Sequence, residues 1–184
     1  MKRVLAIALG LMFTTGVVLA QAAAPKARPS PPGTAEFTFA DGKKVTIAYS
    51  RPHMKDPKTG EVRTIYGGLV PFDQVWRTGA NEATSLKTDV ALDINGTKVP
   101  AGSYTIYSIP SQGQSKLIIN KQTGQWGTVY DEKQDLARIN LTVTDLTTPV
   151  EQFTIAFDKQ GGNTANLNFD WENKRASVVV KEAK

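Results

Sequence analysis

Apolar and polar residues alternate along most of the chain from residue 36 onward. The period of this alternation is two, which is typical of strands with one buried face. The pattern covers residues 37–39 and 45–49 and is interrupted at Asp41-Gly42, a pair that favours a turn. Residues 36–50 are therefore predicted to form a β-hairpin.

A second hairpin is predicted over residues 90–99. Asn95-Gly96 supplies the two positive-φ positions of a type I′ turn, between two short runs of alternating residues. The next predicted strand, residues 103–109, carries apolar side chains on both faces. Because both faces of such a strand favour burial, we expect it in the centre of a sheet.

Further strands follow the same alternation, and turn residues separate them, most clearly at Gly161-Gly162-Asn163 and Glu172-Asn173-Lys174. No amphipathic helix of more than two turns is predicted. About eight or nine short strands with turns between them indicate an all-β fold. The expected architecture is an antiparallel β-sandwich, and its topology, jelly-roll or immunoglobulin-like, stays open. The further strands are predicted at residues 116–120, 137–144, 151–158, 164–171 and 176–181.

The residues before the first hairpin predict export. Lys2 and Arg3 precede a mostly apolar run over residues 4–19, and small or neutral residues lead up to Ala20, which suits cleavage by a signal peptidase. A membrane anchor is the alternative, but the run is shorter than the roughly 20 apolar residues that a spanning helix needs. We therefore expect residues 1–20 to be a signal peptide, the protein to be periplasmic or secreted, and no stable membrane insertion after cleavage.

The next segment predicts a linker and then one domain. Residues 21–35 contain four prolines and no large apolar side chain, which is typical of an extended tether. Residues 36–184 are of a suitable length for a single β-sandwich domain. The formal net charge of +5 comes from scattered basic residues, so we expect no nucleic-acid binding. The absence of cysteine excludes disulfides and an anchor on a lipidated cysteine.

The segment that departs from the strand pattern is residues 51–84. It holds three arginines, Tyr66, Trp76, and the only histidine of the chain, His53. A connection of this length inside a compact domain is unusual unless it is functional or disordered, and its aromatic content argues against disorder. We predict one long ordered loop here and expect the functional site on it.

Several sequence blocks resemble a family of secreted bacterial proteins catalogued as domain of unknown function 2911. They are YSRP at residues 49–52, IYGGLVPFDQVWRTGANEAT at 65–84, PAGSYTIYSIP at 100–110, NKQTGQWG at 120–127 and WE at 171–172. The resemblance implies export and a β-rich domain. It implies no activity, because none is established for the family.

The side chains of the loop suggest a binding module. Arg51 and Arg77 are fork-shaped donors for a carboxylate or phosphate, and Tyr66 and Trp76 offer flat faces for stacking. The ligand is expected to be a small molecule, a glycan or a protein, and no cofactor is expected. Two further residues, Asn81 and Glu82, are predicted to orient polar groups of the ligand.

A structural interpretation of the same residues stays open beside this one. In it, Glu82 is the partner that allows Arg77 to be partly buried, and Trp76 closes one end of the sandwich. Trp126 is predicted to belong to the core or to cap it rather than to bind a ligand. Under this interpretation the chain is a purely structural envelope protein.

Catalysis has less support in the sequence. Without cysteine and with one histidine, a hydrolase-type enzyme would have to use His53, or a pair of carboxylates such as Glu82 and Glu172. A metal site would need His53 together with Glu82 or Asp73, and protein zinc sites normally recruit more histidines or cysteines than this. We predict no metal and favour a protein that is not an enzyme.

Overall fold

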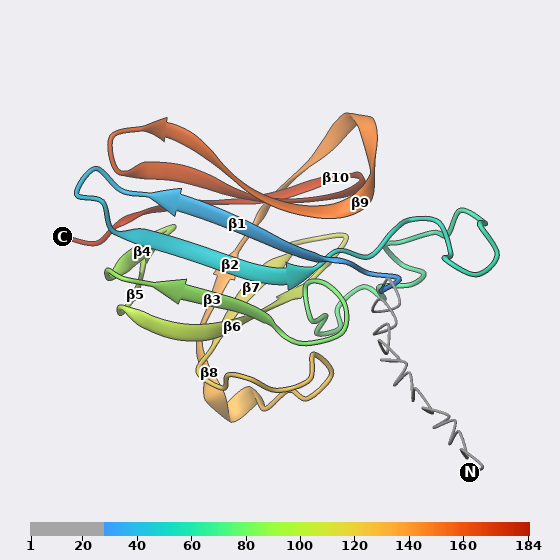
Figure 1. Ribbon diagram of the computed structural model, residues 1–184, viewed down its shortest axis with the longest axis horizontal. Coiled ribbons are helices and arrows are strands. Elements are labelled where there is room, and N and C mark those ends of the chain that lie inside the picture. The colour runs from blue at the N-terminus through green and yellow to red at the C-terminus, as the bar shows by residue number, and fades with distance from the viewer. Residues whose placement is uncertain (1–27) are drawn as a thin grey trace, which may run out of the picture.

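The computed structural model describes residues 28–184 as two antiparallel β-sheets packed face to face (Figure 1). The predicted all-β sandwich is therefore confirmed. The predicted signal peptide, residues 1–20, and residues 21–27 of the predicted linker lie outside the described residues. Within residues 28–184, no helix has the length and apolar character that a membrane crossing requires.

The first sheet has six strands in the order β1-β2-β3-β6-β7-β8. The second has four in the order β5-β4-β10-β9. A single short 3₁₀ helix, Glu132–Gln134, precedes β8 within the described part of the chain. The strands are β1 (Pro32–Thr38), β2 (Lys44–Ser50), β3 (Thr84–Thr88), β4 (Leu92–Ile94), β5 (Thr97–Val99), β6 (Gly102–Ile109), β7 (Lys116–Asn120), β8 (Asp135–Asn140), β9 (Thr142–Gly161) and β10 (Thr164–Glu182).

Both predicted hairpins are confirmed. Strand β1 pairs with β2, and β4 pairs with β5 around Asn95 and Gly96, whose φ angles of 47° and 85° are those that a type I′ turn requires. Strand β6 lies between β3 and β7, as expected from its two apolar faces.

Several strands differ from the prediction. The first strand begins at Pro32, inside the predicted linker, and β3 lies where no strand was predicted. The predicted strand 137–144 is divided between β8 and β9 at Leu141. The predicted turn at residues 172–174 is instead an irregularity within β10, in which Glu172 has a φ of 55° and the pairing register with β9 shifts.

The core fills the space between the two sheets. Val45, Ile47 and Leu86 of the first sheet are fully or almost fully buried, as are Leu167 and Trp171 of the second. The side chain of Tyr49, on β2, also joins the sheets, because its hydroxyl accepts a hydrogen bond from the Ile155 N–H at 2.8 Å. Burial of this apolar surface is the main stabilising contribution in a chain without disulfides.

The 51–84 loop is ordered and contacts both sheets at one end of the sandwich. Near its start, His53 forms an isolated β-bridge with Gln152 of β9, and near its end Trp76 forms one with Ser108 of β6. Figure 1 shows the part of the loop that follows β2 projecting beyond the ends of the strands. The loop therefore connects the two layers at this end, which is where the candidate site lies.

Candidate functional site

A cavity of about 520 Å³ lies beneath the 51–84 loop. The loop contributes Trp76 and Arg77, β6 contributes Tyr107 and β10 contributes Trp171. The connection between β7 and β8 closes another side with residues 127, 128 and 130. Pro29 and Ser30, before β1, also line it, so the cavity depends on five separate parts of the chain.

Aromatic rings form one wall of this cavity. The indole of Trp76 stacks on that of Trp171, with ring centroids 5.7 Å apart and an interplanar angle of 16°. Phe153 of β9 meets Trp76 edge to face at 5.0 Å. Trp171 is only 1% exposed, so this wall is continuous with the core and is held rigidly.

The charged side chains that line the cavity are basic. Arg63 and Arg77 line it together with His53, and no aspartate or glutamate does so. The guanidinium of Arg63 is occupied, because it donates to the carbonyl oxygens of His53 at 2.6 Å and Met54 at 3.2 Å. Arg63 therefore holds the loop.

Arg77 differs from Arg63 because its guanidinium forms no hydrogen bond or ion pair with any residue of 28–184. Its aliphatic part lies against Gly127, where an added Cβ would stand 2.5 Å from the Arg77 Cδ. The Gly127 N–H donates to the carbonyl of Asn81 at 3.0 Å, which fixes this approach. The side chain is thus held along its stem while the charged group has no partner among the described residues.

A second donor without a partner belongs to the same cavity. The indole N–H of Trp171 is buried and has no acceptor within residues 28–184. A buried donor without an acceptor costs free energy, commonly about 1–3 kcal/mol. The nitrogen itself is closed to solvent, so this donor belongs to the packed wall of the cavity.

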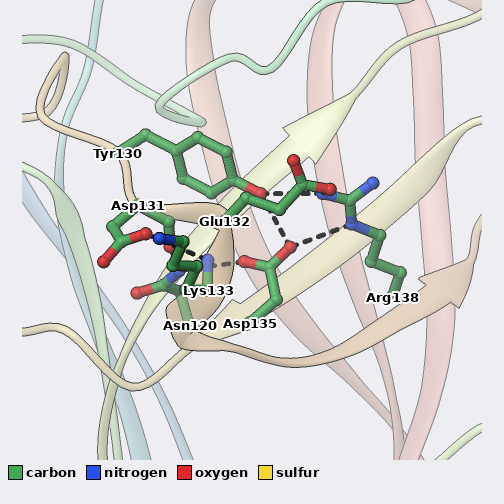
Figure 2. Close-up of polar contacts among 7 residues, drawn as sticks. All are labelled: Asn120, Tyr130, Asp131, Glu132, Lys133, Asp135 and Arg138. Atoms are coloured by element: carbon green, nitrogen blue, oxygen red, sulfur yellow. Dashed lines mark hydrogen bonds and ion pairs between the residues drawn. The ribbon is translucent and has the colours of Figure 1, made fainter.

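The opposite wall is braced by a polar network around Tyr130, which Figure 2 shows. The Tyr130 hydroxyl donates to Asp135 at 2.7 Å and accepts from Arg138 at 2.9 Å. The same carboxylate also accepts from Asn120 and Arg138, both at 2.9 Å. Burial, followed by the hydrogen bond to Asp135, raises the pKa of Tyr130 to about 12, so this hydroxyl stays neutral at physiological pH.

Tyr107 joins this wall to the sheet. Its ring meets that of Tyr130 edge to face at 4.9 Å. Its hydroxyl donates to the Val129 carbonyl at 2.7 Å and accepts from Gln125 at 3.0 Å. These bonds fix the connection between β7 and β8, so the wall formed by residues 127–130 has one defined position.

Three of the six residues predicted to bind a ligand line a cavity. Trp76 and Arg77 line the cavity described above. Tyr66 lines a second cavity of about 450 Å³, which Trp76 also lines.

The other three predicted residues hold the loop in place. Arg51 donates to the Phe153 carbonyl at 3.2 Å and to the Thr154 hydroxyl at 2.9 Å. Asn81, with a positive φ of 59°, donates to the Ser30 carbonyl and the Ser50 hydroxyl, both at 3.3 Å. These contacts attach the loop to β9, to the chain before β1 and to β2.

Glu82 forms an exposed ion pair with Arg28 at 2.9 Å, rather than the pair with Arg77 that the structural interpretation required. Its own backbone N–H, and then Arg28, hold the pKa of its carboxyl below the ordinary value. Trp126, predicted to be core or cap, is 51% exposed because its backbone, not its ring, pairs with the loop at Glu82.

The groups considered for catalysis are not gathered in the cavity. Glu82 and Glu172 do not line it. His53 does, and its Nε2 lies 3.1 Å from the side-chain nitrogen of Gln152. In the described part of the chain, no three side chains of the metal-ligating types gather closely enough to hold an ion.

Sequence reasoning missed Tyr130 and Trp171 as parts of the site. Trp171 could have been suspected, because it stands in one of the blocks that carry the family resemblance. Tyr130 gives no comparable signal, since its role depends on the distant Tyr107 and on Asp135.

Comparison with known proteins assigns a family but no activity. The family model described as "Protein of unknown function (DUF2911)" matches residues 30–180. No curated protein and no solved structure matches the sequence. The match extends over most of the chain, and the protein belongs to this family.

Proposed function

We propose that this family member is a binding module for a small ligand that combines an anionic group with a flat apolar part, held in the cavity beneath the 51–84 loop. The observation that carries the proposal is Arg77, which lines a cavity without acidic side chains and whose guanidinium has no partner among residues 28–184. A carboxylate or phosphate would supply that partner.

The geometry of the cavity supports both parts of such a ligand. A guanidinium presents two parallel N–H donors that match the two oxygens of a carboxylate or phosphate. The stacked pair Trp76 and Trp171 provides an apolar wall for a flat group. Because the site is partly shielded from water, a charged hydrogen bond in it is stronger than one at the surface.

The proposal is tested by calorimetric titration of the purified full chain with four probes. Benzoate and phenyl phosphate carry both a ring and an anion, inorganic phosphate carries only the anion, and benzyl alcohol carries only the ring. We expect benzoate or phenyl phosphate to bind at least about tenfold more tightly than either partial probe, which corresponds to roughly 1.4 kcal/mol. Equal binding of benzyl alcohol would contradict the anionic part of the proposal.

The Arg77→Met variant tests whether the anionic group binds at Arg77. Methionine keeps an apolar stem against Gly127 and removes the charge, so we expect the affinity for phenyl phosphate to fall about tenfold or more, the usual scale for a charged hydrogen bond. The matched control is Lys87→Met, which removes an exposed cation of β3 outside the cavity. If the natural ligand is instead a neutral glycan, its affinity should not change in the Arg77→Met variant.

We also propose that the module acts outside the cytoplasm, on the basis of the sequence of residues 1–20. Fractionation of cells that express the full chain, with mass measurement of the product, tests this proposal. A product that begins at Gln21 in the exported fraction supports it, and a full-length cytoplasmic product contradicts it.

A further inference from the structure

The second cavity is lined by residues of both sheets and of the 51–84 loop, and it shares Trp76 with the first. Its volume is about 450 Å³, and Trp76 is the one residue that lines both cavities. Its walls come from Tyr66 and Phe72 of the loop, from the turn after β6, and from β9 and β10. It reaches the surface, because Val143, Gln112 and Gly113 of its lining are exposed.

Most of its wall is apolar. Phe169 and Leu141 are 4% and 5% exposed, and Val143 and Ala176 continue the wall along β9 and β10. The ring of Phe72 rests against Gly67, where an added Cβ would stand 2.8 Å from the ring. Gly67 also has a φ of 83°, so the close approach of Phe72 and the backbone conformation both favour glycine there.

Several polar side chains also line this cavity, and most of them are already bonded. The hydroxyl of Thr78 donates to that of Ser108 at 2.9 Å, and the Ser115 hydroxyl accepts from the Ser111 N–H at 3.0 Å. The hydroxyl of Tyr66 and the exposed side chain of Gln112 form no hydrogen bond within residues 28–184. Burial, followed by the charges of Glu172 and Asp170, raises the pKa of Tyr66, so its hydroxyl remains a neutral donor.

One charged side chain, Lys174, lines the second cavity. It pairs with Asp145, whose side chain is 73% exposed. An exposed ion pair of this kind contributes little, so Lys174 can turn to a second anion at small cost. An apolar wall with a cation and a free hydroxyl is the arrangement that suits an amphiphile with an acidic head.

We propose that the second cavity binds a ligand with an apolar chain that ends in a carboxylate, of the class of medium-chain fatty acids. The chain lies against Phe72, Leu141 and Phe169. The carboxylate accepts a hydrogen bond from the Tyr66 hydroxyl and pairs with Lys174. This site is separate from the anion site at Arg77 and does not depend on the function proposed for it.

The test uses decanoate as the probe, with the full chain and tryptophan fluorescence as one readout, because Trp76 lines the cavity. Calorimetric titration is the second readout. We expect saturable binding of decanoate, and at least about tenfold weaker binding of 1-decanol, which has the chain without the charge. Absence of saturable decanoate binding overturns the proposal, and equal binding of 1-decanol overturns the part assigned to Lys174 and Tyr66.

Variants of the lining residues, with one control, test whether decanoate binds in the second cavity. Ala176→Leu fills the cavity from β10 and should abolish decanoate binding, whereas Val179→Leu, on the same strand outside the cavity, should leave it unchanged. Tyr66→Phe should weaken decanoate binding by about tenfold and leave 1-decanol binding unchanged, because it removes the donor alone. If Ala176→Leu does not fold, Val143→Phe blocks the same cavity from β9.

Two results would contradict the proposal that decanoate binds in the second cavity. Decanoate binding that survives both Ala176→Leu and Val143→Phe in folded protein places the chain elsewhere. Decanoate binding that is lost in Arg77→Met but retained in Ala176→Leu places the ligand in the first cavity. Circular dichroism and the melting temperature of each variant separate these results from loss of fold.

Discussion

The two ends of the 51–84 loop contain similar side chains and use them differently. At the start, Arg51 is bonded through its guanidinium to Phe153 and Thr154 of β9. At the other end, Arg77 is fixed only along its stem, against Gly127, and its guanidinium has no partner within residues 28–184. The first end attaches the loop, and the second end places an arginine without a partner among residues 28–184 in the lining of a cavity.

The difference shows that the role of each arginine depends on the hydrogen-bond acceptors within its reach. Arg51 lies beside β9, where a carbonyl and a hydroxyl stand within hydrogen-bond distance. Arg77 follows Trp76, whose backbone pairs with Ser108 and whose ring covers Trp171. That pairing holds the Arg77 backbone at the cavity.

The largest expected effect is a difference in the free energy of unfolding between variants of the two arginines. Arg51→Met should lower the free energy of unfolding by about 2 kcal/mol, because it removes partly buried hydrogen bonds from a charged donor. Arg77→Met should change it by less than about 0.5 kcal/mol. Urea denaturation of both variants measures the difference. Equal losses in the two variants would remove the distinction between an attaching and a presenting end.

An effect of similar size is expected when the wall behind Arg77 is moved. In Gly127→Ala the added Cβ would stand 2.7 Å from the Asn81 carbonyl oxygen, a backbone atom that cannot rotate away. We expect a loss of about 1–3 kcal/mol in stability, together with weaker binding of phenyl phosphate. Gly113→Ala is the control, since its Cβ would meet nothing closer than the Ser111 hydroxyl oxygen at 3.8 Å. Unchanged affinity in Gly127→Ala would show that this approach does not shape the site.

The smallest effect concerns the exposed ion pair of Glu82 with Arg28. The pKa of the Glu82 carboxyl is lowered in the folded protein, so its contribution to stability is present above its ordinary pKa of 4.5 and is lost as the pH falls through the lower folded value. Glu82→Gln should therefore slightly lower the melting temperature at pH 7 and leave it unchanged at pH 2. A melting temperature of Glu82→Gln that matches the unaltered protein at both pH values would show that the pair contributes nothing.

The sequence predicted strands correctly where apolar side chains are buried and polar side chains are exposed. Asn95-Gly96 fixes its turn locally, so that hairpin could be found from the sequence. Strand β3 could not, because two of its three buried residues are threonines. Thr84 and Thr88 satisfy their hydroxyls on the carbonyls of Thr78 and Val90, contacts that exist only in the folded chain.

Only the part of the site that is formed by neighbouring residues in the sequence could be predicted. Trp76 and Arg77 are adjacent in a conspicuous loop, and the prediction named both. The difference between Arg51 and Arg77 lies in contacts with residues about a hundred positions away, which residue type does not encode. Glu172 shows the same limit in the fold, since residues 172–174 favour a turn locally, whereas pairing with β9 keeps them within one strand.

The bridges that the loop makes to both layers have a consequence for folding. His53 pairs with Gln152 of the second sheet and Trp76 with Ser108 of the first, so the cavity cannot exist until both sheets are assembled. A compound that occupies it would therefore bind the native state and not the unfolded chain. Each tenfold excess of such a compound over its dissociation constant would raise the stability of the entire domain by a further 1.4 kcal/mol or so, with a corresponding rise in the thermal midpoint.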